Sequence, residues 1–212
     1  MNRVDILPIF PLSAAVLPGE LFPLHIFEDR YRELISYCRG GKDDQSQHPF
    51  GITFVGSDGI SEIGCTMEIA DVLHEFEDGR SVVLTLGEGR YKILEMYSDE
   101  PFPVARVEFI EDDVDEIDTT LRSETIKLFT ETLDLGGYEA QFSDDHDGKI
   151  SFHLAAAIQL DPAERQELLM QLNENLRLKR LNDFLNFRLM TLKQASISSG
   201  EMLFHAVERT LH

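Results

Sequence analysis

The stretch LGEGRYK contains a Gly-x-Gly pair, Gly87 and Gly89, of the kind that lets a backbone approach a phosphate closely. A dinucleotide-binding loop needs a third glycine, where Lys92 stands, and it leads into a helix. Here the residues after Gly89 continue the pattern of a strand. The chain also has no G-x-x-x-x-G-K-[ST] loop. We therefore interpret the glycine pair as a strand irregularity and predict no nucleotide cofactor.

A second candidate is SDDHDGKI, which is similar to a calcium loop at Asp145, Asp147 and Gly148. Ser143 occupies the first ligand position, and Leu154 stands where a bidentate Glu is needed. The seven histidines form no H-x-x-x-H pair, and Cys38 and Cys65 are too far apart in sequence for a zinc motif. We therefore predict a turn at SDDHDGKI and no metal site.

The sequence also has no motif typical of nucleophilic catalysis. No G-x-S-x-G elbow surrounds a serine. We interpret His25 as a hydrogen-bonded packing residue, and Cys38 and Cys65 as reduced core residues. Acid pairs are numerous, but a chain with 39 acidic residues supplies them by chance. We predict no catalytic residue, with an unrecognised acidic active site as the alternative.

The net charge of −20 is unevenly distributed. Residues 1–160 contain 32 acidic and 12 basic residues, whereas residues 161–212 contain seven of each. Such an acidic surface repels phosphate backbones and anionic membranes, so nucleic acid and membrane partners are not expected. No targeting segment and no apolar run of about 20 residues is present. We predict a cytoplasmic location.

The first predicted secondary-structure elements lie in an apolar run that prolines interrupt. Pro18-Gly19 predicts a turn between two extended segments, Leu7–Leu12 and Glu20–Ile26. A helix over Glu28–Arg39 follows, because apolar residues then recur at helical spacing and Gly40-Gly41 ends the pattern. Its packed face is expected to hold Phe27, Tyr31, Leu34, Ile35 and Cys38.

Strands are predicted for the rest of residues 1–110. FGITFV is short and β-branched, and two long alternating segments meet at Asp78-Gly79, a strong hairpin signal. FPVARVEFI supplies a closing strand. The next stretch, Glu111–Asp118, has six acids in eight residues, and we interpret it as a solvated connector.

From Leu121 onward the period is helical. One helix is expected to end at Gly136-Gly137, and FHLAAAIQL begins a second. Asp161 caps a third helix, with Pro162 at its first position and Glu164 completing a capping box. A long helical pattern then passes Lys193, and one further short helix is expected after Ser198-Ser199-Gly200.

The opening stretch, FPLSAAVLPGELFPLHIFEDRYRELI, resembles the start of the amino-terminal, substrate-binding domain of Lon proteases, as found in stand-alone bacterial Lon-domain proteins. The similarity continues in order through PFGITFV, the long hairpin with its G-x-x-R element at Gly87 and Arg90, the closing strand and the helical half. It runs from about Ile6 to Leu192.

The resemblance implies an α+β fold: a β-rich, PUA-like pseudo-barrel with one inserted helix, followed by an α-helical bundle. It divides the chain into a β-rich subdomain, residues 1–115, and a helical subdomain, residues 116–212. Lon proteases continue into ATPase and Ser-Lys protease domains, and neither is expected within these 212 residues.

The resemblance further implies a non-catalytic module that recognises unfolded, partly unfolded or tagged polypeptides. The alternative is a regulatory or structural subunit of one dedicated protein partner, such as a Lon-type protease. No cofactor is expected. The sequence leaves the residues that contact a client unknown, because exposed and buried apolar positions look alike in sequence.

Overall fold

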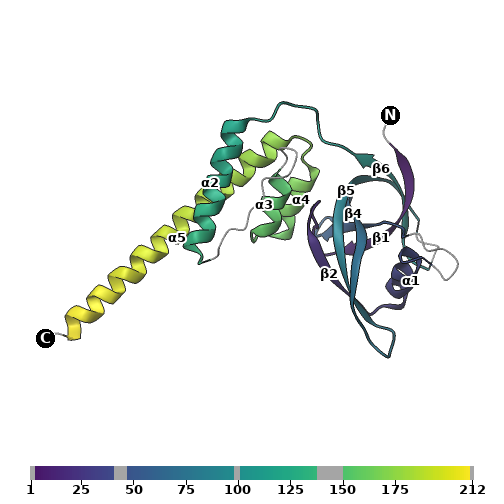
Figure 1. Ribbon diagram of the computed structural model, residues 1–212, viewed down its shortest axis with the longest axis horizontal. Coiled ribbons are helices and arrows are strands. Elements are labelled where there is room, and N and C mark those ends of the chain that lie inside the picture. The colour runs from purple at the N-terminus through teal and green to yellow at the C-terminus, as the bar shows by residue number, and fades with distance from the viewer. Residues whose placement is uncertain (1–2, 41–46, 98–100, 138–149, 211–212) are drawn as a thin grey trace. The chain divides into compact units, whose positions relative to one another are not determined.

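The computed structural model describes residues 3–40, 47–97, 101–137 and 150–210 (Figure 1). By their internal contacts the residues form two compact units. Unit 1 comprises residues 1–113 and 155–172, and unit 2 comprises residues 114–154 and 173–212. The sequence-based boundary between residues 115 and 116 stays a prediction. The structure groups residues 155–172 with the strands, which that division did not anticipate.

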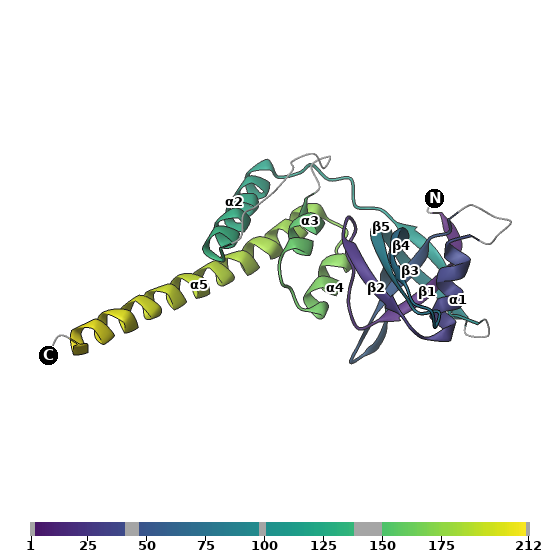
Figure 2. The ribbon, with the colours of Figure 1, turned by 60° about the horizontal axis from the view of Figure 1, so that its bottom comes forward.

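Unit 1 contains a six-stranded sheet and the helices α1 (Asp29–Cys38) and α4 (Pro162–Met170) (Figure 2). The strands are β1 (Val4–Leu12), β2 (Leu21–Ile26), β3 (Phe50–Gly56), β4 (Gly59–Glu75), β5 (Ser81–Tyr97) and β6 (Val104–Ile110). The β1–β3 pair is parallel, and all other pairs are antiparallel. Pairings run β1-β3-β4-β5-β6 and back to β1, so five strands form a closed ring.

Strand β2 lies outside this ring. It pairs with the first half of β5, residues 81–86, whereas the second half of β5, residues 90–97, pairs with β6. Residues Gly87 to Gly89 lie where β5 changes partner, and the β4–β5 register shifts at the same place. The predicted strand irregularity at Gly87 and Gly89 is therefore confirmed.

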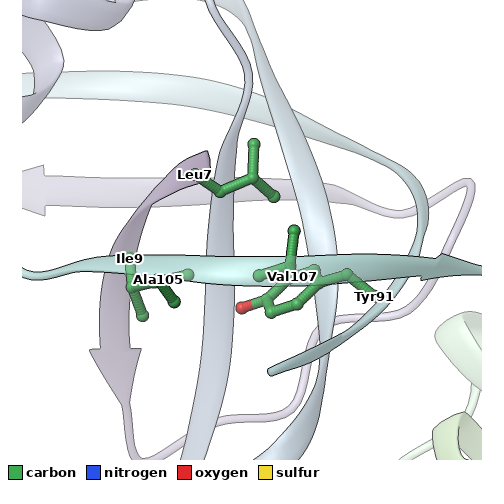
Figure 3. Packing of buried hydrophobic residues seen from close by; sticks show 5 residues of the cluster. All are labelled: Leu7, Ile9, Tyr91, Ala105 and Val107. Carbon is green, nitrogen blue, oxygen red and sulfur yellow. The ribbon is translucent and has the colours of Figure 1, made fainter. Parts of the chain in front are cut away.

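The core of the ring is apolar and tightly packed. Leu7 and Ile9 of β1 meet Tyr91 of β5 and Ala105 and Val107 of β6, all at most 3% exposed (Figure 3). Alternation along each strand directs these side chains to one face. Burial raises the pKa of the Tyr91 hydroxyl, so the Tyr91 side chain stays neutral at physiological pH.

The early helix is confirmed as α1 (Asp29–Cys38), with Tyr31, Leu34, Ile35 and Cys38 buried. Tyr31 stacks on Phe10 of β1, with ring centroids 4.1 Å apart. The prediction was wrong for Phe27. This residue lies before the helix begins and is 59% exposed, because the chain is still extended there.

Helix α4 (Pro162–Met170) belongs to unit 1 and has the predicted capping box between Asp161 and Glu164. Arg165 pairs with Glu20 and donates from Nε to the Ala15 carbonyl oxygen at 2.7 Å. Gln166 Nε2 donates to the carbonyl oxygen of Ile63 at 2.9 Å. Polar contacts therefore hold this helix to the loop before β2 and to β4.

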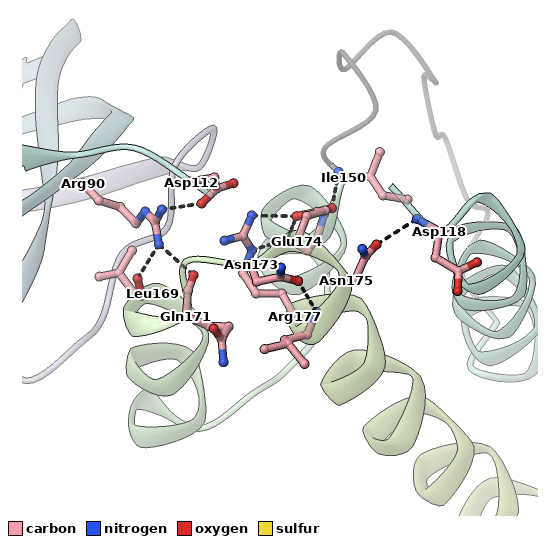
Figure 4. Close-up of polar contacts among 12 residues, drawn as sticks. Arg90, Asp112, Asp118, Ile150, Leu169, Gln171, Asn173, Glu174, Asn175 and Arg177 are labelled. Carbon is pink, nitrogen blue, oxygen red and sulfur yellow. Dashed lines mark hydrogen bonds and ion pairs between the residues drawn. The ribbon is translucent and has the colours of Figure 1, made fainter. Parts of the chain in front are cut away.

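The connector begins with a buried ion pair in unit 1. Arg90 pairs with Asp112, and its Nη1 donates to the carbonyl oxygens of Leu169 at 3.0 Å and Gln171 at 2.8 Å (Figure 4). The Arg90 and Asp112 side chains are only 4% and 7% exposed. The solvated-connector prediction is thus wrong for Asp112, whereas Val114 is fully exposed.

Unit 2 is helical in its described part. Helix α2 (Thr119–Leu135) packs along α5 (Glu174–Thr210), and α3 (Ser151–Ala157) begins in this unit. Glu174 Oε1 accepts the backbone N–H groups of Ile150 and Ser151, and Arg177 donates to Glu174 Oε2 at 2.6 Å (Figure 4). This buried network fixes the start of α3 against α5.

One further expectation was wrong. Helix α5 continues through Ser198, Ser199 and Gly200, so residues 200–210 are no separate helix; a single glycine costs a helix only about 1 kcal/mol. Strand β4 begins at Gly59, because Ser57-Asp58 forms a tight turn after β3 and Gly56 pairs with Gly59. No helix in the described ranges has the length and apolar content needed to cross a bilayer.

Candidate polypeptide-binding surface

The solvent-facing side of β2 and β5 is apolar. In β2 the exposed residues alternate with Leu24 and Ile26, which are buried. Directly opposite residues of an antiparallel pair share one face of the sheet. The exposed residues of β2 are thus matched on β5 by half-buried ones: Leu21 with Leu86, Pro23 with Leu84, and His25 with Val82. We call these six residues, with Phe27 and Phe76, the outer face.

Aromatic side chains gather at one end of the outer face. The His25 ring lies 5.7 Å from Phe27 and 6.1 Å from Phe76, centroid to centroid. His74 of β4 packs edge-on against Phe76 at 4.4 Å, and the Arg80 guanidinium lies 5.0 Å from the Phe76 ring centre. His25 was interpreted as a hydrogen-bonded packing residue; its ring packs against Phe27 and Phe76, and its side chain is exposed.

Large apolar side chains in this patch remain accessible to water. Leu21 is 57% exposed, Phe27 59% and Phe76 36%. Isolated exposed apolar residues are normal, but contiguous ones on a folded domain mark binding surfaces. The outer face therefore has the character expected of a site that covers apolar groups of another molecule.

The loop before β2 fixes the position of the outer face. Leu17 is fully buried, and its N–H donates to Glu20 Oε2 at 3.0 Å. Gly19 N–H donates to the Gly87 carbonyl oxygen at 2.8 Å, and Gly87 N–H donates to the Glu20 carbonyl oxygen at 2.9 Å. A Cβ at Gly87 would lie 2.3 Å from the Leu17 carbonyl oxygen, so the close approach requires glycine here.

Pro23 affects the edge of β2 that the described strands leave unpaired. Gly87 N–H bonds to Glu20, and ladder bonds alternate along an antiparallel pair. The backbone N–H and C=O groups of Phe22, Leu24 and Ile26 therefore point toward β5, whereas the backbone of Pro23 points toward the open edge. Proline has no N–H, so this edge is a poor template for another strand. The side chains of the outer face, rather than its backbone edge, are the available contact surface.

The other residues singled out by sequence do not form a site. Cys38 and Cys65 are buried as predicted, and burial raises the pKa of the Cys38 thiol to about 12. Residues Ser143–Gly148 lie outside the described ranges, and Leu154 is fully buried. Within the described residues, no three His, Cys, Asp or Glu side chains converge as a metal site would require.

Sequence reasoning missed the outer face, although one signal was present. LFPLHIF is apolar at both odd and even positions. A strand with one solvated face normally alternates apolar with polar residues, so a strand apolar on both sides indicates two surfaces that are covered at some time. The inner surface is covered by the core of unit 1.

The fold and this surface can be compared with known proteins. The family model described as the ATP-dependent protease La (LON) substrate-binding domain matches residues 6–186. The chain is 28% identical to Lon protease of Anaeromyxobacter dehalogenans (strain 2CP-C) and 28% identical to Lon protease 2 of Myxococcus xanthus, each over 225 residues and 95% of this chain. It spans about a quarter of these relatives, 26% and 27% of their lengths.

Solved structures show the same fold. The crystal structure of a Lon N-terminal domain protein from Xanthomonas campestris matches with a TM-score of 0.65 and 24% identity, covering 84% of this chain and 96% of that one. The N-terminal domain of Mycobacterium avium complex Lon protease matches with a TM-score of 0.61 and 19% identity, covering 86% and 98%. The resemblance found in the sequence is thus confirmed: the chain belongs to the LON substrate-binding domain family.

Proposed function

We propose that this chain is a non-catalytic module that binds unfolded or partly unfolded polypeptides through the outer face. The observation that carries the proposal is the cluster of exposed apolar residues on β2 and β5, with Leu21 and Phe27 each more than half exposed. Apolar stretches are the feature that unfolded chains share and folded proteins hide. Family membership supports the same assignment.

The composition of the outer face suits varied clients. Its contacts are leucine, valine, proline and aromatic side chains, which gain affinity from buried area without a fixed hydrogen-bond pattern. We also propose that the closed ring with its inserted α1 is PUA-like, and that α2, α3 and α5 belong to a helical bundle.

The test uses an unfolded protein that is reduced, alkylated and fluorescently labelled. Its binding to the chain is measured by fluorescence anisotropy. The L21S/F27S double variant should weaken binding at least tenfold, because burying a leucine or phenylalanine side chain contributes about 1.5–3 kcal/mol. The matched control is F187S on α5, where Phe187 is 72% exposed. Wild-type affinity in L21S/F27S would overturn the proposal, as would an equal loss in F187S.

A second candidate function is docking to one dedicated protein partner through α5. Leu176, Phe187 and Met190 are 51%, 72% and 71% exposed, and their spacing places them on one side of the helix. Affinity capture of the chain from native lysate separates the two functions. Many unrelated, partly unfolded proteins support the first, whereas one stoichiometric partner that F187S releases supports the second.

A further inference from the structure

A cleft of about 650 Å³ adjoins the outer face in unit 1. It lies between the later turns of α1 and the turn that joins β4 to β5. Its lining includes two apolar side chains, Ile35 and Phe76, and one acid, Glu75. It also includes three arginines, Arg32, Arg39 and Arg80. Phe76 belongs to both the cleft and the outer face, so the two surfaces are continuous.

The three arginines differ in how firmly they are held. Arg32 pairs with Asp29 and donates from Nη1 to the Asp78 carbonyl oxygen at 3.0 Å, so two elements anchor it. Arg39 pairs with Glu75 at 2.6 Å, and Arg80 with Asp78 at 2.8 Å. Each of these two arginine side chains is 45% exposed. Exposed ion pairs are weak, so another carboxylate can share or replace these partners.

The two ends of the outer face differ in their neighbouring side chains. At the cleft end, Arg39 and Arg80 stand beside the acids Glu75 and Asp78. At the end away from the cleft, Glu68 of β4 lies opposite Leu86 of β5. An acidic residue of a bound chain would be repelled there. A guanidinium offers five N–H donors in a planar fork that fits a carboxylate, so the cleft end is where an acidic residue is accommodated.

We infer that the cleft binds the side-chain carboxylate of an Asp or Glu that follows the apolar part of a client segment, with Arg39 and Arg80 as its ligands. This inference rests on the proposed function, because the apolar part of the same segment occupies the outer face. This protein, whose net charge is −20, should therefore prefer client segments with an acidic residue at this one position.

The experiment uses three labelled peptides, acetylated and amidated so that no terminal carboxylate is present. They share one apolar core and end in two Glu, two Gln or two Lys. Anisotropy is measured at 0.15 M salt, where the Debye length is about 8 Å and distant charges are screened. Wild-type protein should bind the Glu peptide about threefold more tightly than the Gln peptide.

Four variants assign the effect to the cleft. R39Q/R80Q should reduce binding of the Glu peptide to the level of the Gln peptide. E75Q removes the internal partner of Arg39 and should strengthen Glu-peptide binding about twofold. The controls lie in the Arg106–Glu95 pair, whose side chains are 45% and 53% exposed; Glu95 is fourteen residues along β5 from Ser81 at the cleft. E95Q makes the same charge change as E75Q, and R106Q removes one of the two charges that R39Q/R80Q removes. Both controls should leave the preference unchanged.

Equal affinity of wild-type protein for the Glu and Gln peptides would overturn the inference. So would an equal loss of the preference in R106Q, which would indicate a general charge effect. The Gln peptide reports the outer face separately: if it binds and L21S/F27S weakens it, the proposed function stands while the cleft fails. Native circular dichroism and an unchanged urea midpoint exclude misfolding as the cause.

Discussion

The two sides of the sheet formed by β2 and β5 have similar composition and opposite exposure. On the inner side Leu24, Ile26 and Val83 are at most 4% exposed. On the outer side Leu21 and Phe27 are more than half exposed. Burying a leucine or phenylalanine stabilises a fold by about 1.5–3 kcal/mol. The inner residues provide this stabilisation within the chain, whereas the outer residues could provide it on binding the proposed client.

The difference has a cause in the connectivity. Strand β5 is long enough to pair with β2 along its first half and with β6 along its second. The ring closes through β6, so β2 is left outside it with one face on the core and the other toward solvent. Residues that hold β2 in place should therefore affect stability, and residues on its outer face should affect binding.

The largest expected effect is the loss of Arg90, which binds β5 to the end of α4. R90M leaves Asp112 buried without its ion-pair partner and removes two hydrogen bonds to backbone carbonyls. We expect a loss of about 3–5 kcal/mol in the free energy of unfolding, measured by urea denaturation. The double variant R90M/D112N should recover part of this loss, and no recovery would mean that the charge of Asp112 is not the cause.

The next effect concerns the contact between Gly87 and the loop before β2. G87A places a methyl group 2.3 Å from the Leu17 carbonyl oxygen, so loop or strand must move at a cost of about 2–3 kcal/mol. G89A is the matched control, because its Cβ would lie 3.5 Å from Thr66 Oγ1, an ordinary contact distance. Equal unfolding free energies for the two variants would show that this contact does not hold β2.

A smaller effect is a loss of stability at alkaline pH. Burial raises the pKa of Cys38 to about 12 from 9.0, and it raises the pKa of Cys65 as well. Below about pH 9 both states keep these protons, and above it the unfolded chain releases them while the folded chain does not. The unfolding free energy should therefore fall by about 1.4 kcal/mol per pH unit for each thiol above pH 9.

Urea denaturation under reducing conditions at pH 8, 9.5 and 10.5 measures this slope. C38A removes one of the two buried thiols and should reduce the slope by about 1.4 kcal/mol per pH unit, whatever its effect on stability at pH 8. A slope that C38A leaves unchanged would show that this thiol ionises as readily in the fold as in the unfolded chain.

The smallest expected effect on stability belongs to the outer face. L21S/F27S removes apolar groups that are already more than half exposed, so the unfolding free energy should change by less than about 1 kcal/mol. The inner-side variant L24A should instead lose about 2–5 kcal/mol, because Leu24 is 4% exposed. A comparable loss in both would contradict the division between the two sides.

Much of the fold was predictable because local signals were strong. Asp161, Pro162 and Glu164 encode their capping box in adjacent residues, and Asp78-Gly79 marks the β4–β5 hairpin with Gly79 at φ 85°. Phe27 was placed on a packed helical face because its spacing fits one, yet spacing cannot show that the helix begins two residues later.

The candidate site was less predictable because it depends on long-range pairing. Leu21 and Leu86 are 65 positions apart in sequence, and only the β2–β5 register places them together. Which half of β5 pairs with β2 depends on ring closure by β6, which no short stretch encodes. The same holds for α4: the helix was predicted, but the contacts of Arg165 with the loop before β2 and of Gln166 with β4 were not.

Binding of clients to the outer face can be followed residue by residue in a methyl NMR titration of the full chain with the unfolded-protein probe. We expect the signals of Leu21, Val82, Leu84 and Leu86 to shift with one common dissociation constant, while those of Leu181 and Leu185, buried in unit 2, do not. Shifts confined to unit 2, with the four outer-face signals unchanged, would contradict it.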